Sequence, residues 1–72
     1  MAKREVTSEV AGMVWEVAVA AGQTVEAGEA LMLVESMKME IPIESPVAGK
    51  VVEIRVAKGD VVDEGQTVAV VE

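Results

Sequence analysis

Hydrophobic and polar side chains alternate over two stretches of the chain, and valine is prominent among the hydrophobic residues. In the first stretch, Trp15, Val17 and Val19 alternate with the residues between them. A period of two is typical of a strand that is buried on one face. Residues 51–56 repeat the pattern, so we predict two strands whose charged side chains face water: Glu16, Glu53 and Arg55.

Residues 31–34 and 68–71 are apolar at every position. Short apolar runs of this kind predict strands that are covered on both faces or that lie close to a thin core. Valine, which is branched at Cβ, packs well on a pleated surface. Because no stretch shows the period of an amphipathic helix, the pattern predicts an all-β protein.

The chain contains an internal repeat. Residues 8–35 and 45–72 align without a gap at an offset of 37, and 13 of the 28 aligned positions are identical. Residues 22–28 and 59–65 each begin and end with glycine, which favours a turn on either side of a strand of two or three residues. Each copy therefore predicts about four short strands. Two copies are too few for a solenoid, so we expect one domain, residues 1–72, built as a pseudo-two-fold sandwich or flattened barrel of about eight strands.

The connection between the two copies departs from the usual residue preference of a tight hairpin turn. Strand 31–36 must reverse into strand 39–44, which requires a tight hairpin at Met37 and Lys38. Two-residue loops prefer glycine or asparagine because both central residues often need a positive φ. A broken rule in an otherwise consistent sequence indicates a functional site. Taken alone, however, a lysine in a turn is more often a solvated residue without a role.

Composition narrows the possible functions. Thirteen acidic and six basic residues give a net charge of −7, which disfavours binding to nucleic acid. Cysteine and histidine are absent, so thiolate metal sites, disulfides and histidine-activated nucleophiles are excluded. The N-terminus has no apolar signal region, and no apolar run approaches the ~20 residues that span a bilayer. We expect a cytoplasmic domain with no catalytic residue, no metal ligand and no membrane partner.

The connecting segment carries a specific motif. Glu35-Ser36-Met37-Lys38-Met39 closely resembles the Glu-Ala-Met-Lys-Met signature of the biotin carboxyl carrier family, within the biotinyl/lipoyl domain superfamily. Residues 45–49 match the Pro-x-x-Gly segment that follows the modified lysine in that family, and the resemblance covers nearly the whole chain. It departs from the family pattern at Ser36, where alanine is usual. The resemblance implies a flattened barrel of two four-stranded antiparallel sheets.

The same resemblance implies a carrier and not an enzyme. Lys38 would hold covalent biotin, attached by a biotin protein ligase, with Met37 and Met39 contributing to recognition by the ligase or the carboxylase. Glu35 would help to distinguish this hairpin from a lipoyl hairpin. The domain would carry carboxyl groups from a biotin carboxylase to a carboxyltransferase, as an independent subunit that is monomeric when free.

Three other functions remain as alternatives. A lipoyl carrier has the same fold, but its usual lysine context resembles Asp-Lys-Ala and differs from Met-Lys-Met. An unmodified structural or adaptor module would carry no adduct and would be indifferent to Lys38→Ala. A small hydrolase with paired carboxylates would need a cleft, for which a 72-residue chain has little room.

Overall fold

The computed structural model describes residues 3–72, which form eight β-strands and no helix, so the all-β prediction is confirmed for them. Residues 1 and 2 of the predicted domain lie outside the described part. The strands are β1 (Arg4–Thr7), β2 (Gly12–Val17), β3 (Thr24–Val25), β4 (Ala30–Ser36), β5 (Met39–Glu44), β6 (Gly49–Ile54), β7 (Val61–Val62) and β8 (Thr67–Val71). The two-residue strands β3 and β7 lie between the paired glycines, as predicted.

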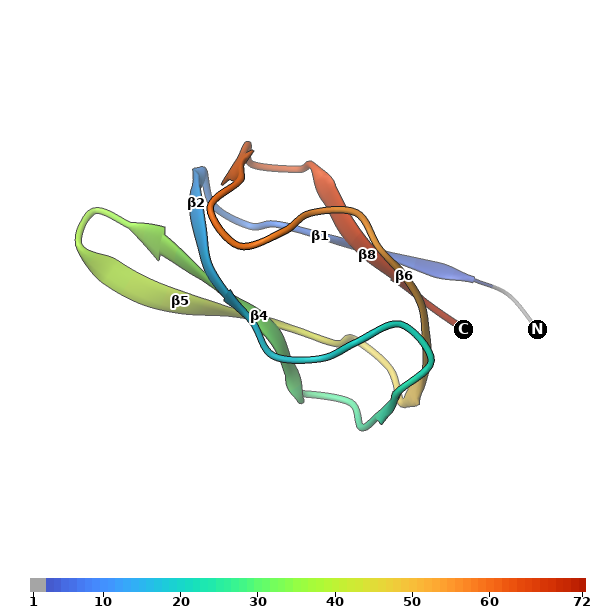
Figure 1. Ribbon diagram of the computed structural model, residues 1–72. Coiled ribbons are helices and arrows are strands. Elements are labelled where there is room, and N and C mark those ends of the chain that lie inside the picture. The colour runs from blue at the N-terminus through green and yellow to red at the C-terminus, as the bar shows by residue number, and fades with distance from the viewer. Residues whose placement is uncertain (1–2) are drawn as a thin grey trace.

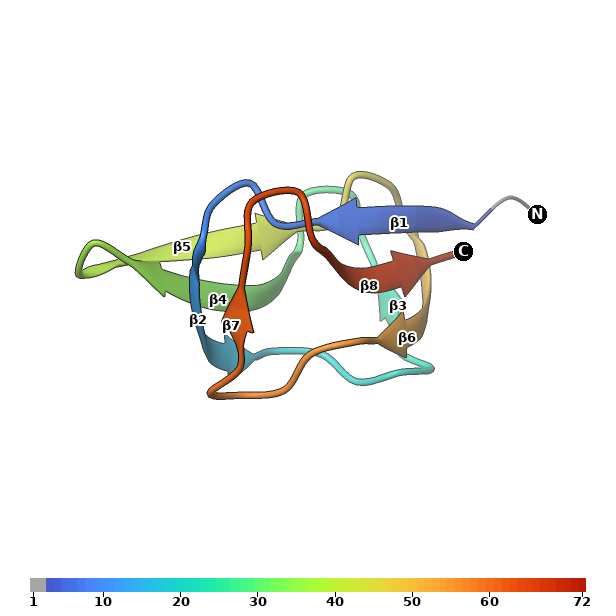
Figure 2. The ribbon, with the colours of Figure 1, turned by 90° about the horizontal axis from the view of Figure 1, so that it is seen from above.

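The strands form two four-stranded antiparallel sheets, as Figures 1 and 2 show. The hairpin sheet has the order β5-β4-β2-β7, and the opposite sheet has the order β1-β8-β6-β3. An offset of 37 residues converts β1, β2, β3 and β4 into β5, β6, β7 and β8, and so converts one strand order into the other. The predicted pseudo-two-fold symmetry is therefore present in the topology.

Each sheet contains strands from both halves of the chain. In the hairpin sheet, β2 pairs with β7 from the second copy, and in the opposite sheet β3 pairs with β6. The N-terminal strand β1 likewise pairs with the C-terminal strand β8. Because these pairings join distant segments, neither half can complete a sheet alone.

The inner faces of the two sheets form one core made mostly of valine. Strands β4 and β8 supply its centre, as expected from their continuous apolar runs: Leu33, which lies half-buried, is the one residue of residues 31–34 and 68–71 that is not fully covered. The core residues are Val6, Val14, Val19, Val25, Leu31, Met32, Val34, Ile43, Val51, Val56, Val62, Val68, Ala69 and Val71.

The strict alternation predicted for residues 14–19 is wrong at one point. The pairing of β2 with β4 shifts between Val14 and Glu16, where β2 contains a β-bulge. A bulge places two residues of one strand opposite one residue of its partner and so interrupts the period of two. Val14 is therefore fully buried, while Trp15 is 46 % exposed on the outer face. The equivalent bulge in β6 exposes Val52 in the same way.

Four turns at glycine close the ends of the short strands. In each, the fourth residue donates its backbone N–H to the carbonyl of the first, and the third residue is a glycine with φ between 85° and 95°. This combination is typical of a type II turn, whose third position strongly favours glycine. The glycines that open and close residues 22–28 and 59–65 therefore have the positive φ that the sequence predicts.

The molecule is elongated, with principal dimensions of 36 × 19 × 18 Å. In both views the connection between β4 and β5 extends beyond the rest of the body at one end (Figures 1 and 2). The C-terminus and the start of β1 lie at the opposite end. Residues 3–72 offer no helix of the length and hydropathy needed to cross a membrane.

Candidate functional site

The hairpin tip, defined as Met37 and Lys38, joins β4 to β5 through a two-residue loop. Ser36 pairs with Met39 directly below it. Met37 has a φ of 53° and Lys38 a φ of 65°. Two central residues with positive φ are the mark of a type I′ turn, whose twist matches that of the flanking strands. The tight hairpin predicted from the sequence is confirmed.

This turn stores backbone strain. A non-glycine residue in the left-handed region brings its Cβ close to the neighbouring backbone, at a cost of about 1–2 kcal/mol per residue. Such a conformation persists only where the surrounding structure imposes it. Here the register of β4 and β5, which runs from Ala30 paired with Glu44 up to Ser36 paired with Met39, leaves two residues for the reversal.

The side chains at the tip are open to solvent. Met37 is 92 % exposed and Met39 is 62 % exposed. Lys38 is exposed as well, and it makes no side-chain hydrogen bond or ion pair with any other residue in the range 3–72. The chain thus presents a free primary amine between two thioethers, and an amine in this position is accessible for covalent modification.

Two carboxylates stand below the tip. Glu35 of β4 and Glu40 of β5 are directly paired across the hairpin, and both are exposed. Like charges in direct cross-strand register destabilise a sheet. Within the described chain the one ion pair joins Arg55 to Glu53, so neither carboxylate has a cationic partner. The base of the hairpin is therefore acidic and uncompensated.

Gly12 holds the hairpin against the body, a role that sequence reasoning missed. A Cβ at Gly12 would collide with the backbone carbonyl of Glu35 and would come within 2.9 Å of Val34. Gly49 makes the same close approach to the carbonyl of Glu72 in the opposite sheet. The identity of these two glycines in the repeat was the signal that could have revealed the role.

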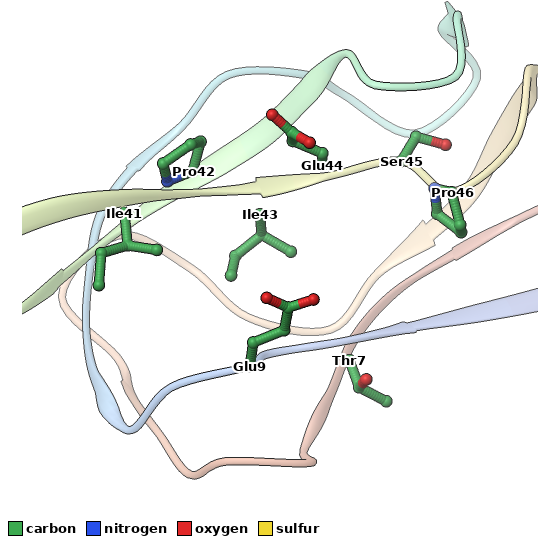
Figure 3. A pocket seen from close by; sticks show the side chains of 8 residues that line it. All are labelled: Thr7, Glu9, Ile41, Pro42, Ile43, Glu44, Ser45 and Pro46. Atoms are coloured by element: carbon green, nitrogen blue, oxygen red, sulfur yellow. The ribbon is translucent and has the colours of Figure 1, made fainter.

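A surface pocket of the described chain lies away from the tip (Figure 3). It has a volume of about 240 Å³ and is lined by residues 41–46 together with Thr7 and Glu9. Figure 3 shows the carboxylate of Glu9 on the same side as Ile43, below β5. The cavity contains none of the predicted site residues Glu35, Met37, Lys38 and Met39, which the structure groups on the hairpin instead.

The fold and this hairpin define a class of protein, a small two-sheet β-domain that displays one exposed lysine on a projecting turn. Residues 3–71 match the family model described as Biotin-requiring enzyme, Biotin_lipoyl. The chain therefore belongs to the biotin/lipoyl family. The family resemblance seen in the sequence is confirmed.

Curated relatives agree with this family. The Biotin/lipoyl attachment protein of Bacillus subtilis (strain 168) is 50% identical over 38 residues, which cover 53% of this chain and 52% of that protein. The Biotinylated protein TB7.3 homolog of Mycobacterium leprae (strain TN) is 46% identical over 39 residues, covering 54% of this chain and 55% of the relative. The chain thus spans about half the length of the curated relatives it matches.

Solved structures share the whole fold. The Kluyveromyces lactis urea carboxylase superposes with a TM-score of 0.95 and 35% identity over 100% of this chain and 6% of its own. A single-chain, multi-domain long-chain acyl-CoA carboxylase superposes with a TM-score of 0.88 and 32% identity over 94% of this chain and 7% of its own. The likeness is therefore confined to a small part of two much larger carboxylases, and it confirms the predicted two-sheet fold.

Proposed function

We propose that Lys38 is the attachment point of covalent biotin and that the domain carries carboxyl groups between a biotin carboxylase and a carboxyltransferase. One observation carries the proposal: in a chain of the biotin/lipoyl family, the lysine of the Met-Lys-Met motif is exposed at a strained, projecting turn. The other described lysines are Lys3, beside β1, Lys50 within β6 and Lys58 in a turn. None of them lies on a projecting hairpin.

The hairpin tip fits an amide linkage to biotin. Within residues 3–72 the Nζ of Lys38 has no hydrogen-bond or ion-pair partner to release, so it can enter the active site of a ligase without disrupting that part of the fold. It must lose a proton before its lone pair can attack the activated carboxyl carbon of biotin. The product amide is neutral, so attachment removes one positive charge from an already acidic chain.

In this proposal the protein presents the biotinylated lysine to its partner enzymes and supplies no catalytic group. When bound, biotin supplies a ureido nitrogen that can accept and release a carboxyl group. A rigid scaffold with a flexible lysyl arm gives that group a high effective concentration at each active site within reach. The exposure of Met37, Lys38 and Met39 allows different enzymes to approach the tip.

The residues around Lys38 serve recognition in this proposal. Met37 and Met39 offer unbranched, polarisable side chains, which adapt to more than one partner surface. Glu35 marks the base of the hairpin with a carboxylate and so helps a biotin ligase to distinguish it from a lipoyl hairpin. We also place this function in the cytoplasm, where the absence of cysteine suits a reducing environment.

The test is expression of the chain with a biotin protein ligase and, in parallel, with a lipoate ligase. We expect an avidin-binding product whose intact mass shows one biotinyl group, with the adduct on Lys38 by peptide mapping. Lys38→Arg should abolish the adduct, while Lys50→Arg and Lys58→Arg should retain it. Biotin on Lys50 or Lys58, or modification by the lipoate ligase alone, would refute the proposal.

A further inference from the structure

The pseudo-symmetry of the fold provides an internal comparison of its two outer faces. Among residues 3–72, six large hydrophobic side chains are exposed, and only Val52 belongs to the opposite sheet. The other five lie on the hairpin sheet or its tip: Met13, Trp15, Met37, Met39 and Val61. Because both sheets have the same strand order and bulges, the scaffold does not require this difference.

Positions of the two sheets that are related by the offset of 37 residues carry different side chains. An offset of 37 replaces Met13 by Lys50, and it replaces Thr24 by Val61. Met13 is 39 % exposed and Val61 is 75 % exposed. The hairpin sheet therefore has apolar side chains at two outer positions where the opposite sheet has a lysine and a threonine.

These side chains form a continuous row across the hairpin sheet. Val61 of β7 pairs with Met13 of β2, Met13 pairs with Glu35 of β4, and Glu35 pairs with Glu40 of β5. We name these four residues the acidic–apolar row. Figure 2 shows β7, β2 and β4 together at the hairpin end of the molecule. The row thus continues from the body of the sheet to the base of the hairpin tip.

The equivalent row of the opposite sheet carries side chains of both charges. Thr24 pairs with Lys50, and the backbone of Lys50 forms two hydrogen bonds of 2.8 Å with that of Glu72. Lys3 takes the place of Glu40 under the same offset. The offset thus gives one carboxylate and two lysines at the equivalent positions, whereas the acidic–apolar row has two adjacent carboxylates and no cation.

This arrangement fits a protein surface that has cations beside an apolar area. Paired carboxylates in direct register repel each other in the free domain. A partner cation placed between Glu35 and Glu40 would remove that repulsion, while Met13 and Val61 would lose their contact with water. Complementary charge of this kind also increases the rate of association.

We infer that the acidic–apolar row is the docking surface for the enzyme that attaches biotin to Lys38, an inference that rests on the proposed function. That enzyme must bring the Nζ of Lys38 itself into its active site, so it must cover the hairpin and the face beside it. The extended biotinyl arm would reach into the active sites of the carboxylase and the carboxyltransferase, so these enzymes need not approach the row so closely. The partner surface carries basic side chains next to an apolar area.

The experiment exchanges the apolar side chains of the row without changing charge. Met13→Gln and Val61→Thr are made singly and together, with Val52→Thr on the opposite sheet as the matched control. Initial rates of biotinylation by a purified ligase are measured against the concentration of the purified unmodified chain. We expect KM to rise about tenfold in the double variant with kcat within about twofold, the pattern of lost ground-state binding. Val52→Thr should leave both constants unchanged.

Circular dichroism and thermal melts establish that each variant is folded. If Met13→Gln unfolds the domain, Val61→Thr still tests the row, because Val61 is 75 % exposed and lies outside the core. NMR of isotope-labelled Lys38→Arg with added ligase gives a readout independent of turnover. The resonances of Met13 and Val61 should shift or broaden, and those of Val52 should not.

The outcomes separate the two proposals. Wild-type chain biotinylated on Lys38, with unchanged KM in the double variant, overturns the docking surface and leaves the carrier function intact. Normal biotinylation combined with slower carboxylation of the modified variants assigns the row to a carboxylase and overturns the ligase assignment. Failure of the wild-type chain to accept biotin overturns both.

Discussion

At the scale of single residues, strain and exposure coincide at the hairpin tip. Met37 and Lys38 are the non-glycine residues with positive φ within residues 3–72, while the four turns at the ends of β3 and β7 all use glycine. Glycine in the tip would relieve the strain, and asparagine would tolerate it better. The needs of the turn therefore do not explain Met-Lys at the tip, whereas the proposed recognition and modification of the tip would.

Replacing Met37 with glycine should separate the effect of backbone strain in the turn from the effect of the exposed side chain on recognition. Met37→Gly should be more stable than Met37→Ala by about 1 kcal/mol, because glycine removes the strain of the positive φ and alanine retains it. Both variants lose the thioether, which is 92 % exposed and so contributes little to the core. Urea denaturation measures the difference, and rates of biotinylation should fall in both. Equal stability of the two variants would show that the turn is not strained.

At the scale of elements, the hairpin depends on its contact with β2. The glycine at the start of β2 lets that strand approach β4 so closely that the carbonyl of Glu35 occupies the space of a Cβ. Pro42 in the edge strand β5 has no N–H to donate, which hinders pairing of that edge with another chain. The hairpin thus packs closely against β2 on one side, and Pro42 hinders pairing with another chain at its free edge.

Gly12→Ala should disturb this contact. The added methyl group meets backbone and not a flexible side chain, so we expect a loss of about 2 kcal/mol or more in the free energy of unfolding. Gly49→Ala is the matched control, because its Cβ meets the carbonyl of Glu72 in the same way. Both variants should lose stability, but the rate of biotinylation of the folded protein should fall only for Gly12→Ala. Equal effects on that rate would contradict a specific role in positioning the hairpin.

At the scale of the whole molecule, the two copies are interlocked, and the hairpin tip lies far from the C-terminus and the start of β1. Pairings such as β1 with β8 and β2 with β7 make each sheet depend on both copies. The tip lies at one end of the long axis and the C-terminus at the other (Figures 1 and 2). In the carboxylase structures it resembles, the matching part makes up 6% or 7% of the chain.

Because the two copies are interlocked and pseudo-symmetric, substitutions at equivalent core positions should lower the free energy of unfolding by similar amounts. Val14 and Val51 are both fully buried at equivalent positions, so Val14→Ala and Val51→Ala should each lower the free energy of unfolding by about 2 kcal/mol. Both should unfold in a single transition in urea, monitored by circular dichroism and by the fluorescence of Trp15. The exposed Val52→Ala should change stability by less than about 0.5 kcal/mol. Two separate transitions would show that the copies unfold independently.

Much of the fold follows from local and repeated sequence patterns. The β-branched residues, the paired glycines and the offset of 37 predicted the eight short strands, the hairpin at Met37 and Lys38 and the pseudo-symmetry. These features depend on backbone preferences and on the period of the side chains, which act between near neighbours. The motif around Lys38 predicted the family in the same way, because its five residues are contiguous.

Tertiary structure alone decided which distant residues meet. The bulge that turns Trp15 outward arises from the register between β2 and β4, and a simple period of two does not contain it. The close approach of Gly12 to Glu35 and the alignment of Val61, Met13, Glu35 and Glu40 likewise depend on pairings between separate strands. A sequence fixes its local preferences residue by residue, but the neighbours across a sheet are chosen by the burial of the whole core.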